Sequence, residues 1–203
     1  MPSMTSHGIS KYYAHASNAF WWIAGEALNF RRGGPNLEND WPNQFQTKPS
    51  KSIIESLQNT SDSVLSYEGQ VERLTEAGFA LWDVVRECDI RNSDDNSVKN
   101  SQPNDIQGFV EKDQPSIRRI VFASGKTSAS IFIRLNKKWL QDGNFALGGG
   151  EFTSDVFAKF INDSENCQVN PIQLVVPVSV SPAAASVPFK TKREQWLSCV
   201  FNA

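Results

Sequence analysis

The chain has 203 residues and a mass of 22.6 kDa, enough for one domain that buries its own core without a disulfide or metal staple. Its 13 Phe, 6 Trp and 3 Tyr exclude an intrinsically disordered chain. Its 20 basic and 22 acidic residues give a net charge of −2, which excludes a large basic footprint of the histone type but not a local basic groove.

The numbers of cysteines and histidines and the lengths of the apolar runs exclude further classes of protein. Three cysteines without a C-x-x-C pair argue against a disulfide scaffold or a zinc ribbon, and a metal site or serine–histidine triad would have to use His7 or His15. The sequence contains no run of about 18 apolar residues, so it predicts no membrane-spanning helix. The apolar run Ala19–Leu28 contains Glu26 and lacks a charged leading region, so it is not a signal peptide. We therefore expect an intracellular protein.

The first half of the chain predicts two helices and a strand. A short apolar helix covers Ala19–Leu28, with Asn18 placed as its N-cap. A second helix covers Tyr67–Ala77 and stops at Gly78. The following apolar stretch, Phe79–Val85, predicts a buried strand.

The second half alternates strands and helices. Ile117–Ala123 predicts a strand that turns at Ser124 into a helix reaching Leu140. Ile172–Val180 predicts another strand, and a helix over about Lys190–Phe201 ends the chain.

This alternation predicts an α/β fold with a parallel sheet covered by helices on both faces. We expect one domain over residues 1–203, with polar surface insertions at about 31–66 and 141–171. Sites in such sheets lie at the carboxyl ends of strands. That rule would bring the Asp83 region, the Ser124 turn and the Ser179–Ala185 loop together.

Two glycine patterns do not indicate nucleotide binding. Gly125-Lys126-Thr127 lacks the first glycine of a P-loop, because Ile120 occupies that position, so a plain turn with Ser124 as N-cap is expected. Gly148–Gly150 does not continue as G-x-G-x-x-G, and a flexible loop is expected there.

The stretch Tyr12–Trp22 packs five aromatic residues, His15 and Asn18 directly before the first helix. Core packing with a helix cap would account for it. A base-binding pocket would account for it as well, with rings to stack on a base and polar groups to read its edges.

The same stretch, followed by Ile23, Gly25 and Glu26, resembles the "YYAHPxNAFWxIxGE" motif of the hypoxanthine-DNA glycosylase branch of the uracil-DNA glycosylase superfamily. Further blocks stand in the family's order, and the last helix carries the expected Trp196. These blocks are Gly78–Val85, Asp89–Ile106 and Val180–Ala183.

The resemblance implies a three-layer α/β/α sandwich with a short parallel sheet. It implies a monofunctional enzyme of base excision repair that hydrolyses the N-glycosidic bond of a deaminated base in DNA. The base would be hypoxanthine first, with uracil or xanthine as alternatives. The family's catalytic Asn falls on Asn18, which would hold the attacking water. No metal or organic cofactor is implied. The partner would be DNA, and the protein would be a monomer of the nucleus or nucleoid.

The remaining site residues follow from the same resemblance. The base pocket would be lined by Ser3, Tyr13, His15 and Ser124. DNA would be contacted by Ser179, Ser181, Pro182, Ala183 and Lys126, with local positive charge also from Lys190, Lys192 and Arg193. The sequence departs from the family at Val178, Ala184 and Ser124, where Pro, Asn and Asn are expected.

The largest departure is at the start. The chain begins Met1-Pro2-Ser3, where the family has a hydrophobic strand and a Gly, so the first central strand is expected to be missing through N-terminal truncation. This leaves a rival hypothesis, a catalytically impaired nucleic-acid-binding module of the same fold. A small-molecule hydrolase is disfavoured, because no G-x-S-x-G motif is present and only two histidines are available.

Overall fold

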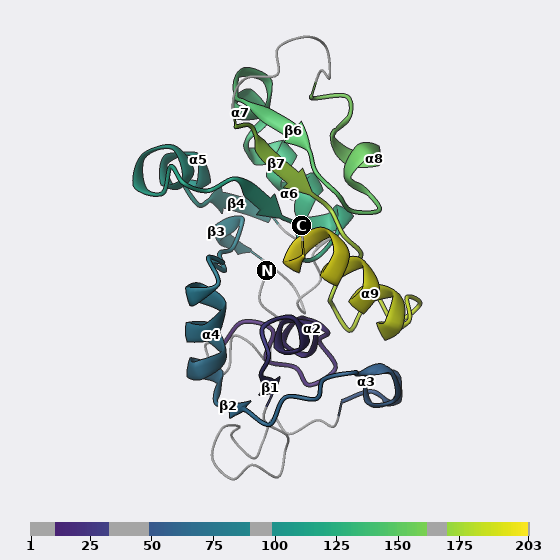
Figure 1. Cartoon of the computed structure of the whole chain (residues 1–203). Coiled ribbons are helices and arrows are strands. Elements are labelled where there is room, and N and C mark those ends of the chain that lie inside the picture. Colours follow the sequence, from purple (N-terminus) through teal and green to yellow (C-terminus); the bar gives the residue numbers. More distant parts are fainter. Residues whose placement is uncertain (1–10, 33–48, 90–98, 162–169, 203) are drawn as a thin grey trace. The chain divides into compact units, whose positions relative to one another are not determined.

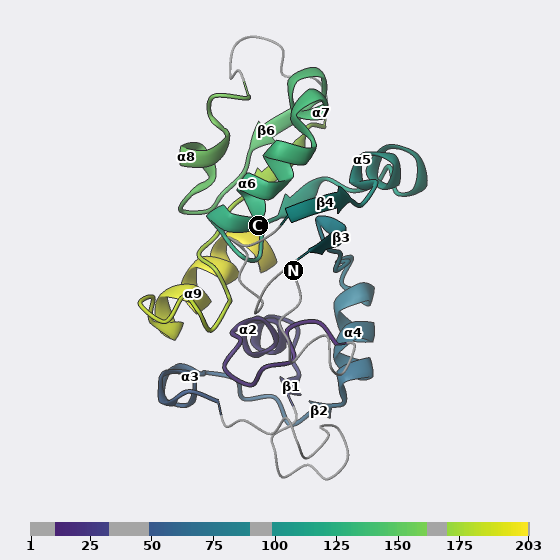
Figure 2. The same cartoon turned by 180° about the vertical axis from the view of Figure 1, so that it is seen from behind.

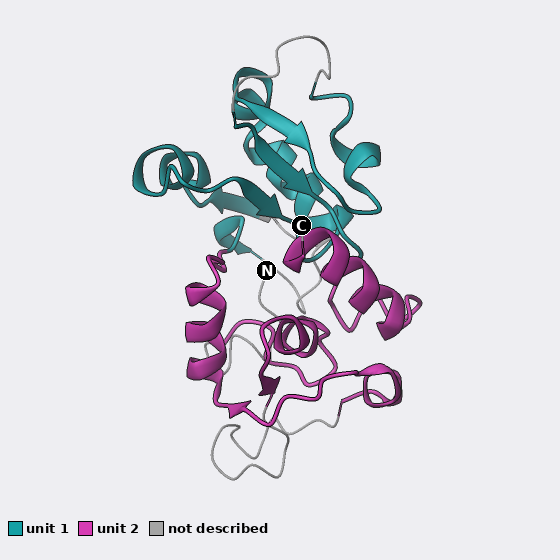
Figure 3. Cartoon of the chain, viewed as in Figure 1, with its two compact units in different colours: residues 1, 83–179, 203 teal, residues 2–82, 180–202 magenta. Residues whose placement is uncertain are grey.

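A computed structural model describes residues 11–32, 49–89, 99–161 and 170–202 of the chain (Figure 1). These residues fall into two units (Figure 3). Apart from the two end residues of the chain, unit 1 comprises residues 83–179, and unit 2 comprises residues 2–82 together with 180–202. Unit 2 is thus built from both ends of the sequence. The expectation of a single domain stays a prediction.

Unit 1 is centred on a three-stranded parallel sheet. Its strands, in spatial order, are β5 (Arg119–Val121), β7 (Ile172–Val175) and β6 (Phe145–Leu147). Because β7 lies in the middle, it has a neighbour on each edge, which suits its apolar side chains. The strands predicted within Ile117–Ala123 and Ile172–Val180 are confirmed, each shorter than expected.

Helices join these strands and share a core with them. They are α6 (Lys126–Leu135), α7 (Lys137–Asp142) and α8 (Thr153–Phe157). Figure 2 shows α6 lying over one face of the sheet. The core includes Phe122, Phe132, Trp139, Phe157 and Leu174.

The helix predicted to run unbroken to Leu140 is corrected to two helices. The break falls at Asn136, whose φ of −123° is not helical. Its Nδ2 donates to the carbonyl of Phe132 at 3.0 Å. An Asn side chain that bonds the backbone in this way competes with continued helix.

The strand predicted over Phe79–Val85 is wrong. The structure begins a strand only at its last residue, where β3 (Val85–Asp89) pairs antiparallel with β4 (Lys99–Pro103). Trp82, in the middle of the apolar run, is 47% exposed. An apolar run becomes a strand only where a partner lies along its edge, and in the described chain that pairing starts at Val85. After β4 come α5 (Ile106–Gly108) and the π-helical turn η3 (Phe109–Asp113).

The segment 141–171, predicted as a surface insertion, contributes to unit 1 instead. It supplies strand β6, and its described part buries Thr153, Phe157 and Ile161. Residues 162–169 lie outside the described ones.

The glycine run in this segment is packed, which corrects the expectation of a flexible loop. A Cβ on Gly148 would stand 2.6 Å from Cγ2 of Val175, and one on Gly150 would stand 2.9 Å from the carbonyl of Val176. Thr153 Oγ1 accepts from Val176 N–H at 2.8 Å. Glycine therefore allows this backbone to lie directly against β7 and the residue after it.

Unit 2 gathers its helices around an aromatic core. Its elements are α2 (Phe20–Ala27), β1 (Arg31–Arg32), α3 (Lys51–Ser56), β2 (Val64–Leu65), α4 (Tyr67–Glu76), α9 (Phe189–Trp196) and the π-helical turn η4 (Leu197–Phe201). Trp21 and Trp196 are almost completely buried, and Phe20 meets both rings edge-on, with centroids 4.9 and 5.9 Å away. The predicted helices of this unit are confirmed. Gly78, with φ of 84°, follows the end of α4.

The segment 31–66, predicted as a polar insertion, also carries structure. Strands β1 and β2 pair in parallel, and Arg32, Ile53 and Ser61 are buried. Residues 33–48 lie outside the described part.

The structure is a mixed α/β fold, as predicted, with small parallel and antiparallel sheets. Among the described residues, no helix combines the length and apolar character needed to cross a bilayer. The predicted absence of the first central strand and the predicted pocket residue Ser3 both concern residues 1–10, which lie outside the described range.

Candidate active site

The turn before α2 carries most of the predicted site. Within it, Tyr13 has a φ of 53°, a region that a bulky residue seldom occupies. Two indole N–H groups fix the turn: Trp21 Nε1 donates to the carbonyl of Tyr12 at 2.9 Å, and Trp22 Nε1 donates to that of Ala16 at 2.7 Å. The aromatic residues of the motif therefore hold the backbone as well as filling the core.

Asn18 ends this turn, and its amide is fixed on one side. The residue is 8% exposed. Its Oδ1 accepts from the backbone N–H of Phe20, the first residue of α2, at 3.0 Å. The N-cap of α2 is Ala19, without a side-chain cap bond, so the prediction of Asn18 as the N-cap is wrong by one residue. Its own N–H donates to the carbonyl of His15 at 2.9 Å. Within the described part of the chain, Asn18 Nδ2 has no protein acceptor, so this donor is available to a water or a ligand.

His15 is half-buried and held in one tautomer. Its Nδ1 accepts from the N–H of Ser17 at 3.1 Å, which places the proton of the neutral ring on Nε2. Burial first, and then the positive charge of Arg32, keep the pKa of His15 below its usual value. His15 is therefore a neutral Nε2–H donor at neutral pH, the form that can bond a carbonyl oxygen.

Tyr13 is half-buried and packs within the aromatic cluster. Its ring lies 4.5 Å from that of Phe20 and 6.3 Å from that of Tyr12, measured between centroids. The packing interpretation of Tyr13 is thus realised in the structure, and stacking on a base stays a prediction.

Arg32 belongs to this site although sequence reasoning missed it. It is 5% exposed, and its Nη2 donates to the carbonyl of Ala14 at 2.8 Å. Its Nη1 lies 3.5 Å from the carbonyl of His15, and its guanidinium lies 5.3 Å from the Trp22 ring centroid. Burial lowers the pKa of Arg32 to about 9. In sequence, the pair Arg31-Arg32 resembles any solvated charge pair, and only strand β1 turns one of the two inward.

The loop after Val180 lies next to the Asn18 turn. The N–H of Ala19 donates to the carbonyl of Val180 at 3.0 Å. Because Ser181, Pro182 and Ala183 follow directly, the structure brings these predicted DNA contacts beside the predicted catalytic residue within unit 2.

The side-chain hydroxyl and the backbone carbonyl of Ser181 both accept hydrogen bonds. Its Oγ accepts from the N–H of Ala183 at 3.2 Å, and its carbonyl accepts from Nζ of Lys192 at 2.9 Å. Lys192 is 5% exposed, and burial lowers its pKa. Lys192 therefore orders the loop, a role that its sequence context does not reveal.

Three other candidates, Ser124, Lys126 and Ser179, lie in unit 1. Gly125, with φ of 62°, is the N-cap of α6, so the expected cap role of Ser124 is corrected. A Cβ on Gly125 would stand 3.4 Å from the backbone N of Ser179. The Ser124 turn and Ser179 are thus neighbours, as expected from the strand-end rule.

The basic residues considered for DNA contact are engaged elsewhere. Lys126 pairs with Asp155 at 3.0 Å, and Lys190 pairs with Glu194 at 3.9 Å. Lys126 also lies over the Phe152 ring, 4.4 Å from its centroid. A phosphate would have to compete with these carboxylates.

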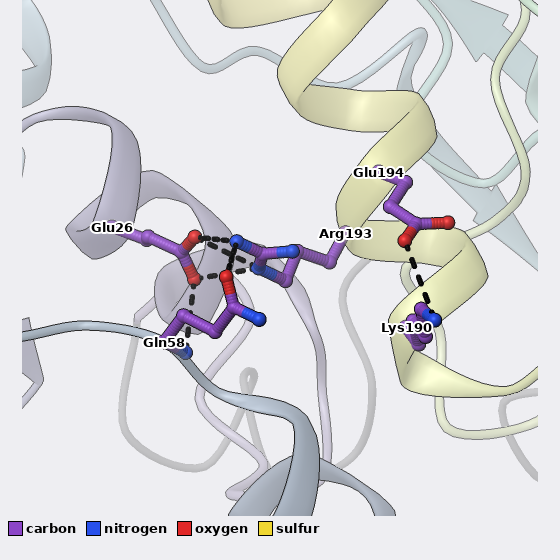
Figure 4. Close-up of polar contacts among 5 residues, drawn as sticks. All are labelled: Glu26, Gln58, Lys190, Arg193 and Glu194. Carbon is purple, nitrogen blue, oxygen red and sulfur yellow. Dashed lines mark hydrogen bonds and ion pairs between the residues drawn. The ribbon is translucent and has the colours of Figure 1, made fainter.

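Arg193 makes the most buried ion pair in the described part of unit 2. Its guanidinium donates through Nε and Nη2 to Glu26 of the motif, and Nη2 also donates to Gln58 Oε1 at 2.9 Å (Figure 4). Hydrogen bonding to Glu26 raises the pKa of Arg193. The Glu26 of the motif is therefore structural, joining α2 to α9.

The second and third motif blocks meet in unit 1. Asn104 donates through Nδ2 to the carbonyl of Asp83 at 2.7 Å and through its backbone N–H to that of Val84 at 3.2 Å. Asp105 caps α5 by accepting from Gly108 N–H at 2.9 Å. The Pro-Asn-Asp-Ile part of the motif thus fixes the backbone at the end of the preceding block.

Comparison with known proteins adds no relative: no protein-family model, curated protein or solved structure matches the chain. The resemblance to the hypoxanthine-DNA glycosylase branch is therefore carried by the motif residues alone. In the described part of the chain, no three His, Cys, Asp or Glu side chains are placed to hold a metal ion.

Proposed function

We propose that the chain is a monofunctional DNA glycosylase that releases a deaminated base, hypoxanthine first and uracil or xanthine as alternatives. The observation that carries the proposal is the environment of Asn18. Its amide is buried, locked through Oδ1 to Phe20 N–H, and set in one turn with His15. Such a group can be aimed at a reacting centre without reorganising.

The chemistry needs a placed water rather than a strong nucleophile. The glycosidic bond breaks through a loose, oxocarbenium-like state, and the base leaves with the bonding electron pair. The water oxygen bonds to the sugar carbon, and the proton that the water loses neutralises the departing base anion. Asn18 Nδ2 donates to the oxygen of that water, and the second lone pair of Oδ1 accepts one of its protons. The amide thereby directs a free lone pair of the water at the sugar.

The leaving base carries developing negative charge, which a donor must stabilise. His15 supplies the neutral Nε2–H for a carbonyl oxygen of the flipped base. A neutral donor suits this task because it discriminates a carbonyl group from the amino group of an undamaged adenine.

The proposal includes a three-layer α/β/α sandwich as the fold and DNA repair as the role in the cell. Leu174 and Val175 are successive residues of β7, so their side chains point to opposite faces of the parallel sheet, and both are fully buried. Buried side chains on both faces support a three-layer α/β/α sandwich, which an experimental structure of the full chain would test. DNA in the nucleus or nucleoid is the expected partner.

A base-release assay tests the function. A duplex with one deoxyinosine or deoxyuridine is incubated with the protein, and abasic sites are revealed by hot alkali. We expect cleavage with the parent and a loss of at least about 100-fold in Asn18→Ala. Asn202→Ala, which changes an exposed Asn at the end of η4, should retain the parental rate.

The rival, an impaired nucleic-acid-binding module, makes a different prediction. It would bind the deoxyinosine duplex in a gel-shift experiment but release no base, even from folded protein at high enzyme excess. That result would contradict the proposal that the protein is a DNA glycosylase.

A further inference from the structure

We infer that Arg32 is a positioning residue: its buried guanidinium clamps the carbonyls of Ala14 and His15 and so holds the turn that presents His15 and Asn18. The catalytic meaning of this inference rests on the proposed function. The clamp itself is a property of the folded chain and can be tested separately.

The first support is burial. Arg32 is 5% exposed, and burying its guanidinium costs free energy unless the protein supplies acceptors. Backbone carbonyls of the turn supply them, at 2.8 Å for Ala14 and 3.5 Å for His15. The face of Trp22 adds a further favourable contact at 5.3 Å.

The second support is how these carbonyls are used. The carbonyl of His15 also accepts the backbone N–H of Asn18 at 2.9 Å. One oxygen therefore links the cation, the His15 residue and the Asn18 backbone. Moving Arg32 would release the turn at the point where both proposed site residues depend on it.

The third support is strain. Tyr13, the residue before Ala14, holds a φ of 53°. Such a conformation in a bulky residue persists only where surrounding bonds over-determine it. The Arg32 bond to Ala14 and the Trp21 bond to Tyr12 act on the two neighbours of Tyr13 and provide that constraint.

Arg32 also has an electrostatic effect on the imidazole. Among the described residues, it is the charged group that acts on His15, and its positive charge disfavours a second proton on the ring. The clamp thus fixes the turn and helps keep His15 in its neutral donor form.

Two readouts and three variants test the inference in the full chain. Arg32→Gln removes the charge, Arg32→Lys keeps the charge but loses the two-pronged donor, and Arg31→Gln alters the exposed neighbour on the same strand. The first readout is an NMR titration of the His15 ring, assigned with His15→Gln. The second is the single-turnover rate of base release from a deoxyinosine duplex.

We expect Arg32→Gln to raise the pKa of His15 and Arg31→Gln to leave it unchanged. Arg32→Lys should keep the low pKa yet release base about tenfold more slowly, the effect of one lost charge-assisted hydrogen bond. If Arg32→Gln does not fold, Arg32→Lys alone tests the inference. A parental His15 pKa together with a reduced rate of base release in Arg32→Lys then supports the clamp.

Parental pKa and parental rate in both Arg32 variants would overturn the inference. If the folded parent releases no base, the proposed function fails, and the titration alone decides the clamp. A raised His15 pKa in Arg32→Gln then supports it, and an unchanged pKa overturns it.

Discussion

Asn18 and His15 show how single residues can serve structure and chemistry together. The Oδ1 of Asn18 accepts from Phe20 N–H, and this bond fixes the amide while its Nδ2 has no acceptor among the described residues. The Nδ1 of His15 accepts from Ser17 N–H, and this bond leaves Nε2–H as the donor of the neutral ring. In both residues one polar atom is used for folding, which fixes where the other one points.

The hydrogen bond from Phe20 N–H to Asn18 Oδ1 predicts that substitutions of Asn18 change the stability of the fold. Asn18→Ala leaves Phe20 N–H without its acceptor and should lower the free energy of unfolding by about 1 kcal/mol. Asn18→Asp keeps an acceptor there and should lose less. Urea unfolding of the three proteins measures this, and equal losses in the two variants would argue against the bond.

His15 predicts a pH dependence of stability. Its pKa is lowered on folding, so below about pH 6.5 the unfolded chain binds a proton that the folded chain does not. Stability is therefore full above that pH and falls as the pH drops through it. The decrease stops once the folded imidazole protonates too.

Unfolding free energies at about pH 7.5 and about pH 5.5 test this. The parent should lose more stability between the two than His15→Gln does, because the variant lacks the titrating ring. Identical losses in both proteins would contradict the lowered pKa.

At the level of elements, the Glu26–Arg193 pair joins α2 to α9 and invites comparison with the exposed Lys190–Glu194 pair on the same helix (Figure 4). The side chains of the first pair are 13% and 12% exposed, so losing one partner leaves a poorly hydrated charge. Glu26→Gln should cost about 2 kcal/mol. Glu194→Gln should cost at most about 0.5 kcal/mol.

Thermal or urea unfolding distinguishes the two substitutions. A double variant, Glu26→Gln with Arg193→Met, should recover part of the loss because no charge is then stranded. Equal costs for Glu26→Gln and Glu194→Gln would show that the first pair is as weak as a surface pair.

Thr153 tests the packing of α8 and the glycine run against β7. Its Oγ1 accepts from Val176 N–H at 2.8 Å and donates to the carbonyl of Gly149 at 2.9 Å. Thr153→Val keeps the shape but strands both groups and should cost about 1–3 kcal/mol. Thr153→Ser keeps the hydroxyl and should be milder. A stable Thr153→Val protein would instead favour the loose loop that the sequence suggests.

Over the whole chain, regular periodicity made some elements predictable. Helices at 20–27, 67–76 and 189–196 have apolar faces and clear start or stop residues, and strands β5 and β7 are apolar runs before turns. The apolar run at 79–85 has the same local character as a strand. It fails because pairing depends on a partner elsewhere in the sequence, which local pattern does not encode.

Some residues of the candidate site could be predicted from the sequence, and others could not. His15 and Asn18 stand out because their types are unusual beside an aromatic run. Arg32 and Lys192 do not, because a cation in sequence is by default a solvated one, and only tertiary folding buries these two against loop carbonyls. The structure also shows Lys126 and Arg193 paired with carboxylates, which sequence cannot foresee.

The central claim is that Asn18 directs water in base release, and one ratio tests it most directly. Single-turnover rates of hypoxanthine release from a deoxyinosine duplex are measured for the parent and Asn18→Ala, each at its own folded concentration. We expect measurable release by the parent and a fall of at least about 100-fold in the variant. Equal rates would contradict the assignment of Asn18, and no release by a folded parent would contradict the enzyme itself.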